Sequence, residues 1–230
     1  MKLVLFDIDG TLLLSDGAGR RAITRALLEV YGESGPTDYH FDGKTDPQIV
    51  RELMQLAGLE DERIDAGMTQ LFTRYVDCLH EELRAPGHRP CTLPGVPALL
   101  NALEEKVDVT LGLLTGNLRV GAQAKLAAVG LDADRFRVGA YGSDHEHRPR
   151  LPAVALERAR AELGIEFHGK HVVVIGDTPA DLTCGNGVGA RAIGVATGRY
   201  SVSDLAEHDP LAVFEDLTET DSVVRAIVGR

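Results

Sequence analysis

Apolar and polar residues follow two different patterns along the chain, and the change between them divides the sequence. A short apolar run over residues 2–6 predicts a buried strand. From residue 15 to about residue 90, apolar positions recur at helical spacing and no strand-like alternation occurs. Amphipathic helices are predicted over residues 19–31, 47–57 and 64–83.

A linker with four prolines and two glycines follows over residues 84–97, and strands then alternate with helices. Strands are predicted at 109–114, 137–141, 172–175, 190–195 and 213–214, and helices at 97–105, 120–129 and 152–163. Such alternation predicts an α/β fold, a Rossmann-like doubly wound parallel sheet. We expect residues 1–15 and 91–230 to form this core and residues 16–90 to form a helical insert.

Composition narrows the class of protein. The chain has 44% hydrophobic residues and a formal net charge of −11, which favours a globular protein and argues against nucleic acid as a partner. No apolar run approaches the roughly 20 residues that a membrane span needs. Cys78, Cys91 and Cys184 are too widely spaced for a zinc or disulfide framework, and Met1 leads directly into the first strand. We therefore expect a cytoplasmic protein. No apolar stripe is in surplus of the predicted core, so no oligomeric state is indicated.

The first strand ends in two carboxylates, in the segment Val-Leu-Phe-Asp-Ile-Asp-Gly-Thr over residues 4–11. Asp7 and Asp9 lie two positions apart, so an extended chain points them the same way. Carboxylates that lie close together repel, and one must be protonated or both must share a cation. The alternative is an ordinary strand-to-helix loop in which one aspartate caps a helix.

Two later strands end in similar residues, Thr115-Gly116-Asn117 and Gly176-Asp177, and Asp181 follows the second one. The carboxyl ends of parallel strands meet at one sheet edge, where α/β proteins bind ligands. Backbone N–H groups after Thr115 can bind an anion. Oxygen ligands without His or Cys favour Mg²⁺, and a magnesium ion beside a spare aspartate indicates phosphoryl transfer.

Three segments of the chain, in their order and spacing, resemble the motifs of the haloacid dehalogenase-like hydrolase superfamily. They are Asp-Ile-Asp-Gly-Thr, Leu-Leu-Thr-Gly-Asn and Gly-Asp-Thr-Pro-Ala-Asp. The insert resembles the small helical cap of its phosphoglycolate phosphatase-like members. The resemblance implies that Asp7 is the nucleophile and forms an aspartyl-phosphate. It implies that Asp9 is first the general acid and then the general base. The remaining implied roles are phosphoryl binding by Thr115, Gly116 and Asn117, and Mg²⁺ binding by Asp7, the Asp9 carbonyl, Asp177 and Asp181.

The third motif of that superfamily is a basic residue, usually a lysine followed by proline, and this sequence departs from it. Arg148 precedes Pro149 and can bind phosphate through two donors. Arg150 is a near alternative. Lys125 is a third candidate, but it lies about two turns into a predicted helix, and we expect it to be too far from the helix start.

The insert is expected to select the substrate. Arg20, Arg21, Lys44 and Thr45 lie in its polar loops and are candidates to contact a substrate carboxylate or hydroxyl, although any one of them can equally be a solvated residue. We predict a Mg²⁺-dependent phosphatase that hydrolyses a small phosphorylated metabolite. The alternatives are a phosphomutase, a phosphonate hydrolase with Lys44 as its Schiff-base lysine, or a non-catalytic binding module. A dehalogenase would not need Asp9.

Overall fold

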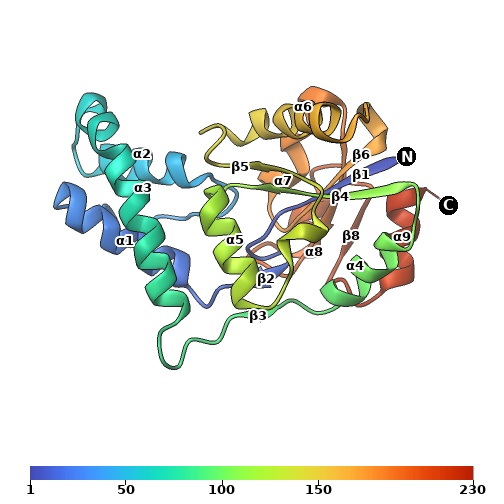
Figure 1. Ribbon diagram of the computed structural model, residues 1–230, viewed down its shortest axis with the longest axis horizontal. Helices are drawn as coiled ribbons and strands as arrows, with labels where there is room; N and C mark the ends of the chain where they lie inside the picture. Colours follow the sequence, from blue (N-terminus) through green and yellow to red (C-terminus); the bar gives the residue numbers. More distant parts are fainter. Residues whose placement is uncertain (230) are drawn as a thin grey trace.

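The computed structural model describes residues 1–229 and has a central sheet of six parallel strands (Figure 1). The strand order is β5-β4-β1-β6-β7-β8. The strands are β1 (Lys2–Phe6), β4 (Val109–Thr115), β5 (Val138–Tyr141), β6 (Val172–Gly176), β7 (Arg191–Val195) and β8 (Ala212–Phe214). Because β1 pairs with β4 on one side and with β6 on the other, the carboxyl ends of these three strands lie side by side.

Helices cover both faces of the sheet, and the alternation of side chains along β1 shows how. Val4 and Phe6 belong to the apolar cluster that includes α4 (Val96–Glu104), α5 (Arg119–Ala128) and α9 (Thr220–Val228). Leu3 and Leu5 belong to the opposite cluster with α6 (Leu151–Leu163) and α7 (Pro179–Cys184), while the short α8 (Val202–Ala206) packs beside β7. This arrangement confirms the predicted doubly wound α/β fold.

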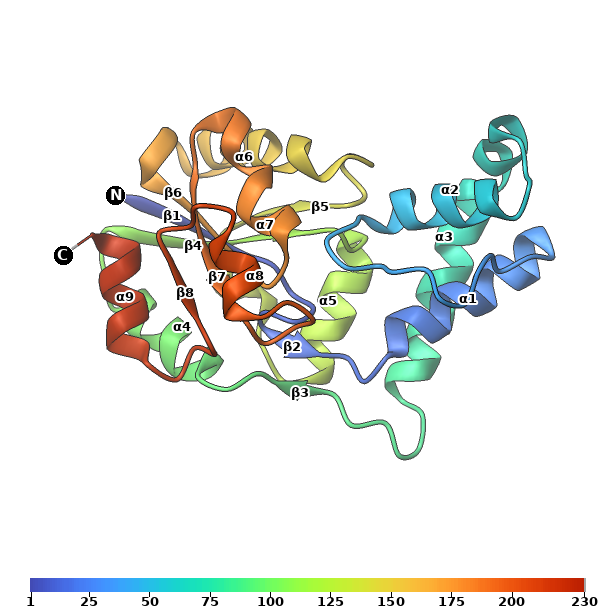
Figure 2. The same ribbon diagram turned by 180° about the vertical axis from the view of Figure 1, so that it is seen from behind.

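The helical insert forms a separate lobe to one side of the sheet, at the left in Figure 1 and at the right in Figure 2. It contains α1 (Ala18–Tyr31), α2 (Asp46–Leu56) and α3 (Asp61–Leu83), which share an apolar cluster of their own. The three predicted helices are confirmed, and α3 starts three residues earlier than predicted. Hereafter the insert is called the cap.

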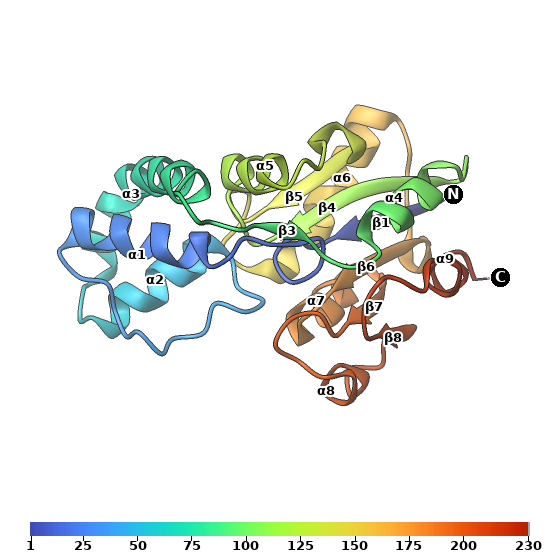
Figure 3. The same cartoon turned by 90° about the horizontal axis from the view of Figure 1, so that it is seen from below.

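Two short strands join the start and the end of the cap to the sheet. β2 (Leu13–Leu14) pairs antiparallel with β3 (Cys91–Thr92), so the outgoing and returning segments run together. Seen from below, the cap lies beyond the end of the sheet at which the carboxyl ends of β1 and β4 are found (Figure 3). Within residues 1–229, no helix combines the length and the apolar character needed to cross a membrane.

Candidate active site

The carboxyl end of β1 places Asp7 and Asp9 beside the end of β6. The backbone N–H of Asp7 donates to the Ile175 carbonyl at 2.9 Å, which extends the strand pairing and fixes the start of the loop. Gly10 follows with φ of 80°, and a Cβ at this position would overlap the Asp177 carboxylate. Glycine is therefore required where the loop after β1 passes the end of β6.

Asp7, Asp177 and Asp181 form a buried carboxylate cluster, and one oxygen from each lies within 4.8 Å of the others. The Thr11 hydroxyl donates to Asp177 at 3.1 Å. Asp181 belongs to the capping box that starts α7, where it accepts from the Thr178 backbone at 3.1 Å and from its hydroxyl at 2.6 Å. These oxygens are held in place by the local fold before any ligand binds.

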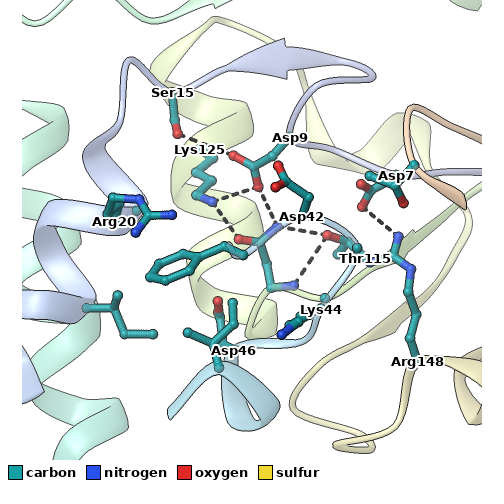
Figure 4. Close-up of a pocket in the computed structure, with 18 of the residues that line it drawn as sticks. Asp7, Asp9, Ser15, Arg20, Asp42, Lys44, Asp46, Thr115, Lys125 and Arg148 are labelled. Carbon is teal, nitrogen blue, oxygen red and sulfur yellow. Dashed lines mark hydrogen bonds and ion pairs between the residues drawn. The ribbon is translucent and has the colours of Figure 1, made fainter. Parts of the chain in front are cut away.

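Arg148 supplies the positive charge next to this cluster (Figure 4). Its Nη2 lies 3.1 Å from Asp7 Oδ1 and also contacts Asp181, and the side chain is only 4% exposed. Arg150 is exposed and does not line the cavity. Of the three basic candidates, Arg148 is the one that contacts Asp7.

The carboxylate cluster carries more negative charge than Arg148 can offset. Burial raises the pKa of Asp7 to about 6, Arg148 opposes the rise, and Asp181 and Asp9 add to it. Burial, followed by Asp181 and Asp7, raises the pKa of Asp177 well above its ordinary value. Three buried carboxylates with one guanidinium therefore fit a divalent cation bound through oxygen ligands, as Mg²⁺ is.

Lys125 lies in the site, and the expectation that it would be too far away is wrong. Its Nζ lies 2.7 Å from Asp9 Oδ2 and 2.6 Å from Asn117 Oδ1, and the side chain is 5% exposed. The helix α5 lies alongside the site rather than pointing away from it, and the long side chain reaches Asp9 from the buried face that also carries Ala122. Lys125 thus pairs with Asp9, and Arg148 pairs with Asp7.

Asn117 and Thr115 complete the surroundings of Asp9. The Asn117 amide donates to Asp9 Oδ2 and to the Thr115 hydroxyl, both at 2.8 Å, and Ser15 donates to Asp9 Oδ1 at 3.3 Å. Desolvation alone would raise the pKa of Asp9, but Lys125 and the hydrogen bonds from Asn117 and Ser15 outweigh it and lower the pKa.

A cavity of about 270 Å³ lies between these core residues and the cap. Arg20 and Lys44, two of the candidates for a substrate contact, line it, and the contact itself stays a prediction. Arg20 donates to the Tyr39 carbonyl at 2.9 Å and stacks 3.8 Å above the centroid of the Phe41 ring. Lys44 Nζ lies 2.8 Å from Glu52. Gly116 also lines the cavity, and its Cα faces the backbone of the cap loop at Lys44.

Two other cap candidates are occupied elsewhere. Thr45 is buried but does not line the cavity, since its hydroxyl donates to the Glu146 carbonyl at 2.5 Å and accepts from Gln48 at the start of α2. Arg21 pairs with Glu82 at 2.6 Å. A substrate contact by either residue therefore stays a prediction.

Two residues that were not predicted from the sequence, Asp46 and Tyr75, reach the cavity from α2 and α3. Burial raises the pKa of Asp46 to about 6, although Lys125 and the backbone N–H of Leu118 oppose the rise. The sequence feature that could have indicated Asp46 is an acidic residue at the buried start of a cap helix. For Lys125 the signal was a lysine on the apolar face of a predicted helix, where a charged side chain needs a partner.

Comparison with known proteins gives a consistent result. A family model described as haloacid dehalogenase-like hydrolase matches residues 4–186. A probable phosphatase of Dickeya dadantii is 27% identical over 98% of this chain and 94% of its own. A phosphoglycolate phosphatase of Rhodospirillum rubrum is 28% identical over 94% of this chain and 87% of its own. The crystal structure of a hydrolase from Pseudomonas syringae superposes with a TM-score of 0.74 at 21% identity and covers 99% of both chains, which shows the shared fold.

Proposed function

The chain belongs to the haloacid dehalogenase-like hydrolase family, and from that premise we propose that it is a Mg²⁺-dependent phosphatase that hydrolyses a small phosphorylated metabolite through an aspartyl-phosphate. One observation carries the proposal. Asp7 is buried in a cluster with Asp177 and Asp181, and the Arg148 guanidinium lies 3.1 Å from one of its oxygens. Residues 16–90 act in this proposal as a cap domain on the α/β core.

The Mg²⁺ ion would be held by the carboxylates of Asp7, Asp177 and Asp181 and by the Asp9 carbonyl. When bound, the ion supplies positive charge to the phosphoryl group and offsets the excess charge of the carboxylates. The buried oxygens and their raised pKa values support this assignment.

In the first step, an Asp7 oxygen attacks phosphorus and the bond from phosphorus to the leaving oxygen breaks. Asp9 gives its proton to the leaving oxygen, so an alcohol departs. The Thr115 hydroxyl and the backbone N–H groups of the loop at Gly116 and Asn117 would bind the phosphoryl oxygens, and Arg148 offsets the charge that builds up on them. The product of this step is a phosphate covalently bound to Asp7.

In the second step, Asp9 is ionised and takes a proton from water, whose oxygen attacks phosphorus. The bond between phosphorus and Asp7 breaks, which releases inorganic phosphate and restores both carboxyl groups to their starting states. Lys125 and Asn117 hold the Asp9 carboxylate at 2.7 and 2.8 Å, and this supports a fixed position for the group that moves the proton.

The size of the cavity and the contacts of Lys44 help to choose between a phosphatase and a phosphonate hydrolase. Its volume of about 270 Å³ suits a small ester, in keeping with the phosphoglycolate named for the Rhodospirillum rubrum relative. A phosphonate hydrolase would need Lys44 uncharged in order to form a Schiff base. In the structure Lys44 Nζ is held by Glu52 at 2.8 Å and by the Tyr39 hydroxyl at 2.6 Å, so the amine is engaged within the cap, which argues against that chemistry.

The test is hydrolysis of an aryl phosphate by the wild-type protein and by Asp7→Asn, with Mg²⁺ or with a chelator. We expect Mg²⁺-dependent turnover that falls by about four orders of magnitude or more in Asp7→Asn, because an amide is a poor nucleophile. Asp204→Asn makes the same change at an exposed residue of the core helix α8 and should keep full activity. Retained turnover in Asp7→Asn would rule out the covalent mechanism.

A further inference from the structure

The cap loop at residues 43–46 is packed against the loop that follows β4. The Asp46 backbone N–H donates to the Gly116 carbonyl at 2.7 Å. A Cβ at Gly116 would overlap the Lys44 carbonyl, and a Cβ at Gly142 would overlap the Gly116 carbonyl. Three backbone segments therefore meet at distances that only glycine permits, so the position of the cap loop and the path of residues 115–117 depend on each other.

The Asp46 side chain makes a second bond across the same boundary. Its Oδ2 accepts from the Leu118 backbone N–H at 2.8 Å, and the carboxylate is almost completely buried. Leu118 immediately precedes α5, and a leucine side chain cannot accept a hydrogen bond from the first N–H groups of its helix. A carboxylate of the cap thus accepts from the backbone N–H of the N-cap residue of a core helix, the bond that the N3 side chain of a capping box ordinarily makes within one helix.

The cap also contacts the loop that carries Arg148. The Thr45 hydroxyl donates to the Glu146 carbonyl at 2.5 Å, and Arg51 Nε lies 2.8 Å from a Glu146 carboxylate oxygen. Glu146 lies two residues before Arg148. The start of α2 therefore contacts the two core loops that supply groups for a phosphoryl ligand.

We propose that Asp46 is a positioning residue that, with the cap docked, fixes the start of α5 and so holds Thr115 and Asn117 in place to bind the phosphoryl group. The inference rests on the proposed function, because it gives the loop at residues 115–117 its ligand. Cap docking then does more than cover the cavity, since it also completes the phosphate-binding loop of the core.

The substitutions Asp46→Ala and Asp46→Asn separate this role from a role of the charge. Alanine removes the acceptor for Leu118, whereas the asparagine side-chain oxygen can still accept that bond. Asp61→Ala is the matched control, because Asp61 is likewise the first residue of a cap helix but is exposed and lies outside the cavity.

Two readouts are needed: hydrogen exchange of the Leu118 amide measured by NMR, and kcat/KM for an aryl phosphate together with the affinity for inorganic phosphate. In Asp46→Ala we expect Leu118 exchange at least about tenfold faster, and kcat/KM and phosphate affinity lower by about 10- to 100-fold, the effect of losing a hydrogen bond to a charged group. Asp46→Asn should stay within about threefold of the wild type, and Asp61→Ala within about twofold.

If Asp46→Asn lowers kcat/KM and phosphate affinity as much as Asp46→Ala does, the charge of Asp46 is what matters and the proposal is overturned. Unchanged exchange of the Leu118 amide in Asp46→Ala would also overturn it. If Asp46→Ala does not fold, Gly116→Ala displaces the Lys44 carbonyl and keeps the Asp46 side chain, and it must expose the Leu118 amide for the proposal to stand. Absence of turnover in the wild-type protein would contradict the proposed function. The exchange and phosphate-binding results would still decide whether Asp46 positions this loop.

Discussion

Asp7 and Asp9 lie two residues apart at the end of one strand, yet the structure gives them opposite surroundings. Asp7 faces two further carboxylates and one guanidinium, and its pKa is raised to about 6, chiefly by burial. Asp9 faces Lys125 and hydrogen-bond donors, which together lower its pKa. The comparison teaches that neighbours contributed by other elements, rather than the motif itself, assign different chemistry to two identical side chains.

The two sides of the site also differ in what they lack. Around Asp7, three buried carboxylates face one guanidinium, so the excess negative charge must be offset by bound protons or by a cation. Around Asp9, a lysine and an amide already match the carboxylate, and that side is complete within the protein. Substitutions on the two sides should therefore respond differently to metal and to pH.

Among substitutions of Asp9, Asp177 and Lys125, Asp9→Asn is expected to have the largest effect on the rate of hydrolysis. It keeps the shape of the side chain but removes the group that donates and accepts the proton. Hydrolysis of an alkyl phosphate should slow by on the order of 10²- to 10⁴-fold, the usual contribution of general acid–base catalysis. An aryl phosphate with a good leaving group should be affected much less in its first step, because its leaving oxygen needs no proton.

Mass spectrometry provides the direct check on Asp9→Asn. After mixing with the aryl phosphate, this variant should accumulate phosphorylated protein, since the water that attacks in the second step has lost its base. Equal slowing of the aryl and alkyl substrates, with no phosphorylated protein, would show that Asp9 does not transfer the proton.

An intermediate effect is expected from Asp177→Asn, which removes one carboxylate from the side of Asp7. Mg²⁺ affinity, measured by titration of activity and by calorimetry, should fall at least about tenfold because a charged ligand is lost. An unchanged titration would contradict its assignment as a ligand. Asp204→Asn is again the control, since its exposed carboxylate lies at the start of α8.

Although Asp177→Asn should weaken Mg²⁺ binding, it should make the metal-free protein more stable than the wild type. The pKa of Asp177 is raised in the native state, so above the ordinary carboxyl pKa the native state binds more protons than the unfolded chain. Stability therefore falls as pH rises through that range. In chelator near neutral pH, Asp177→Asn should unfold at a higher temperature than the wild type, and the difference should shrink toward about pH 4. A difference that grows at low pH would contradict this origin.

The residues that follow strands could be predicted from the sequence, because a run of apolar residues that ends in a carboxylate is a local pattern. Asp7, Asp177 and Thr115 were placed in this way, and the structure brings them to one sheet edge. Strand β1 was predicted with its observed bounds. By contrast, β2 and β3 have two residues each, too few to leave a pattern.

The parts that could not be predicted depend on how separate elements pack. The distance of Lys125 from the helix start suggested that it lay outside the site, but only the packing of α5 against the core decides which group its side chain reaches. Asp46 reads as an ordinary residue at the start of a helix, and its contact with Leu118 depends on how the cap sits on the core. Local periodicity carries no information about either arrangement.

The smallest effect is expected from Lys125→Met, which alters the surroundings of Asp9 without touching the side of Asp7. Because Lys125 lowers the pKa of Asp9, its loss should raise that pKa. The first step needs protonated Asp9, so the high-pH limb of kcat/KM for an alkyl phosphate should move to higher pH. The rate at its optimum should fall by about tenfold as the hydrogen bond to Asp9 is lost.

Lys125→Arg keeps the charge and should leave the high-pH limb near its wild-type position. Mg²⁺ affinity should stay the same in both variants, because Lys125 contacts none of the three clustered carboxylates. A shift of the limb to lower pH, or an equal shift in Lys125→Arg, would show that the charge of Lys125 does not set the protonation of Asp9.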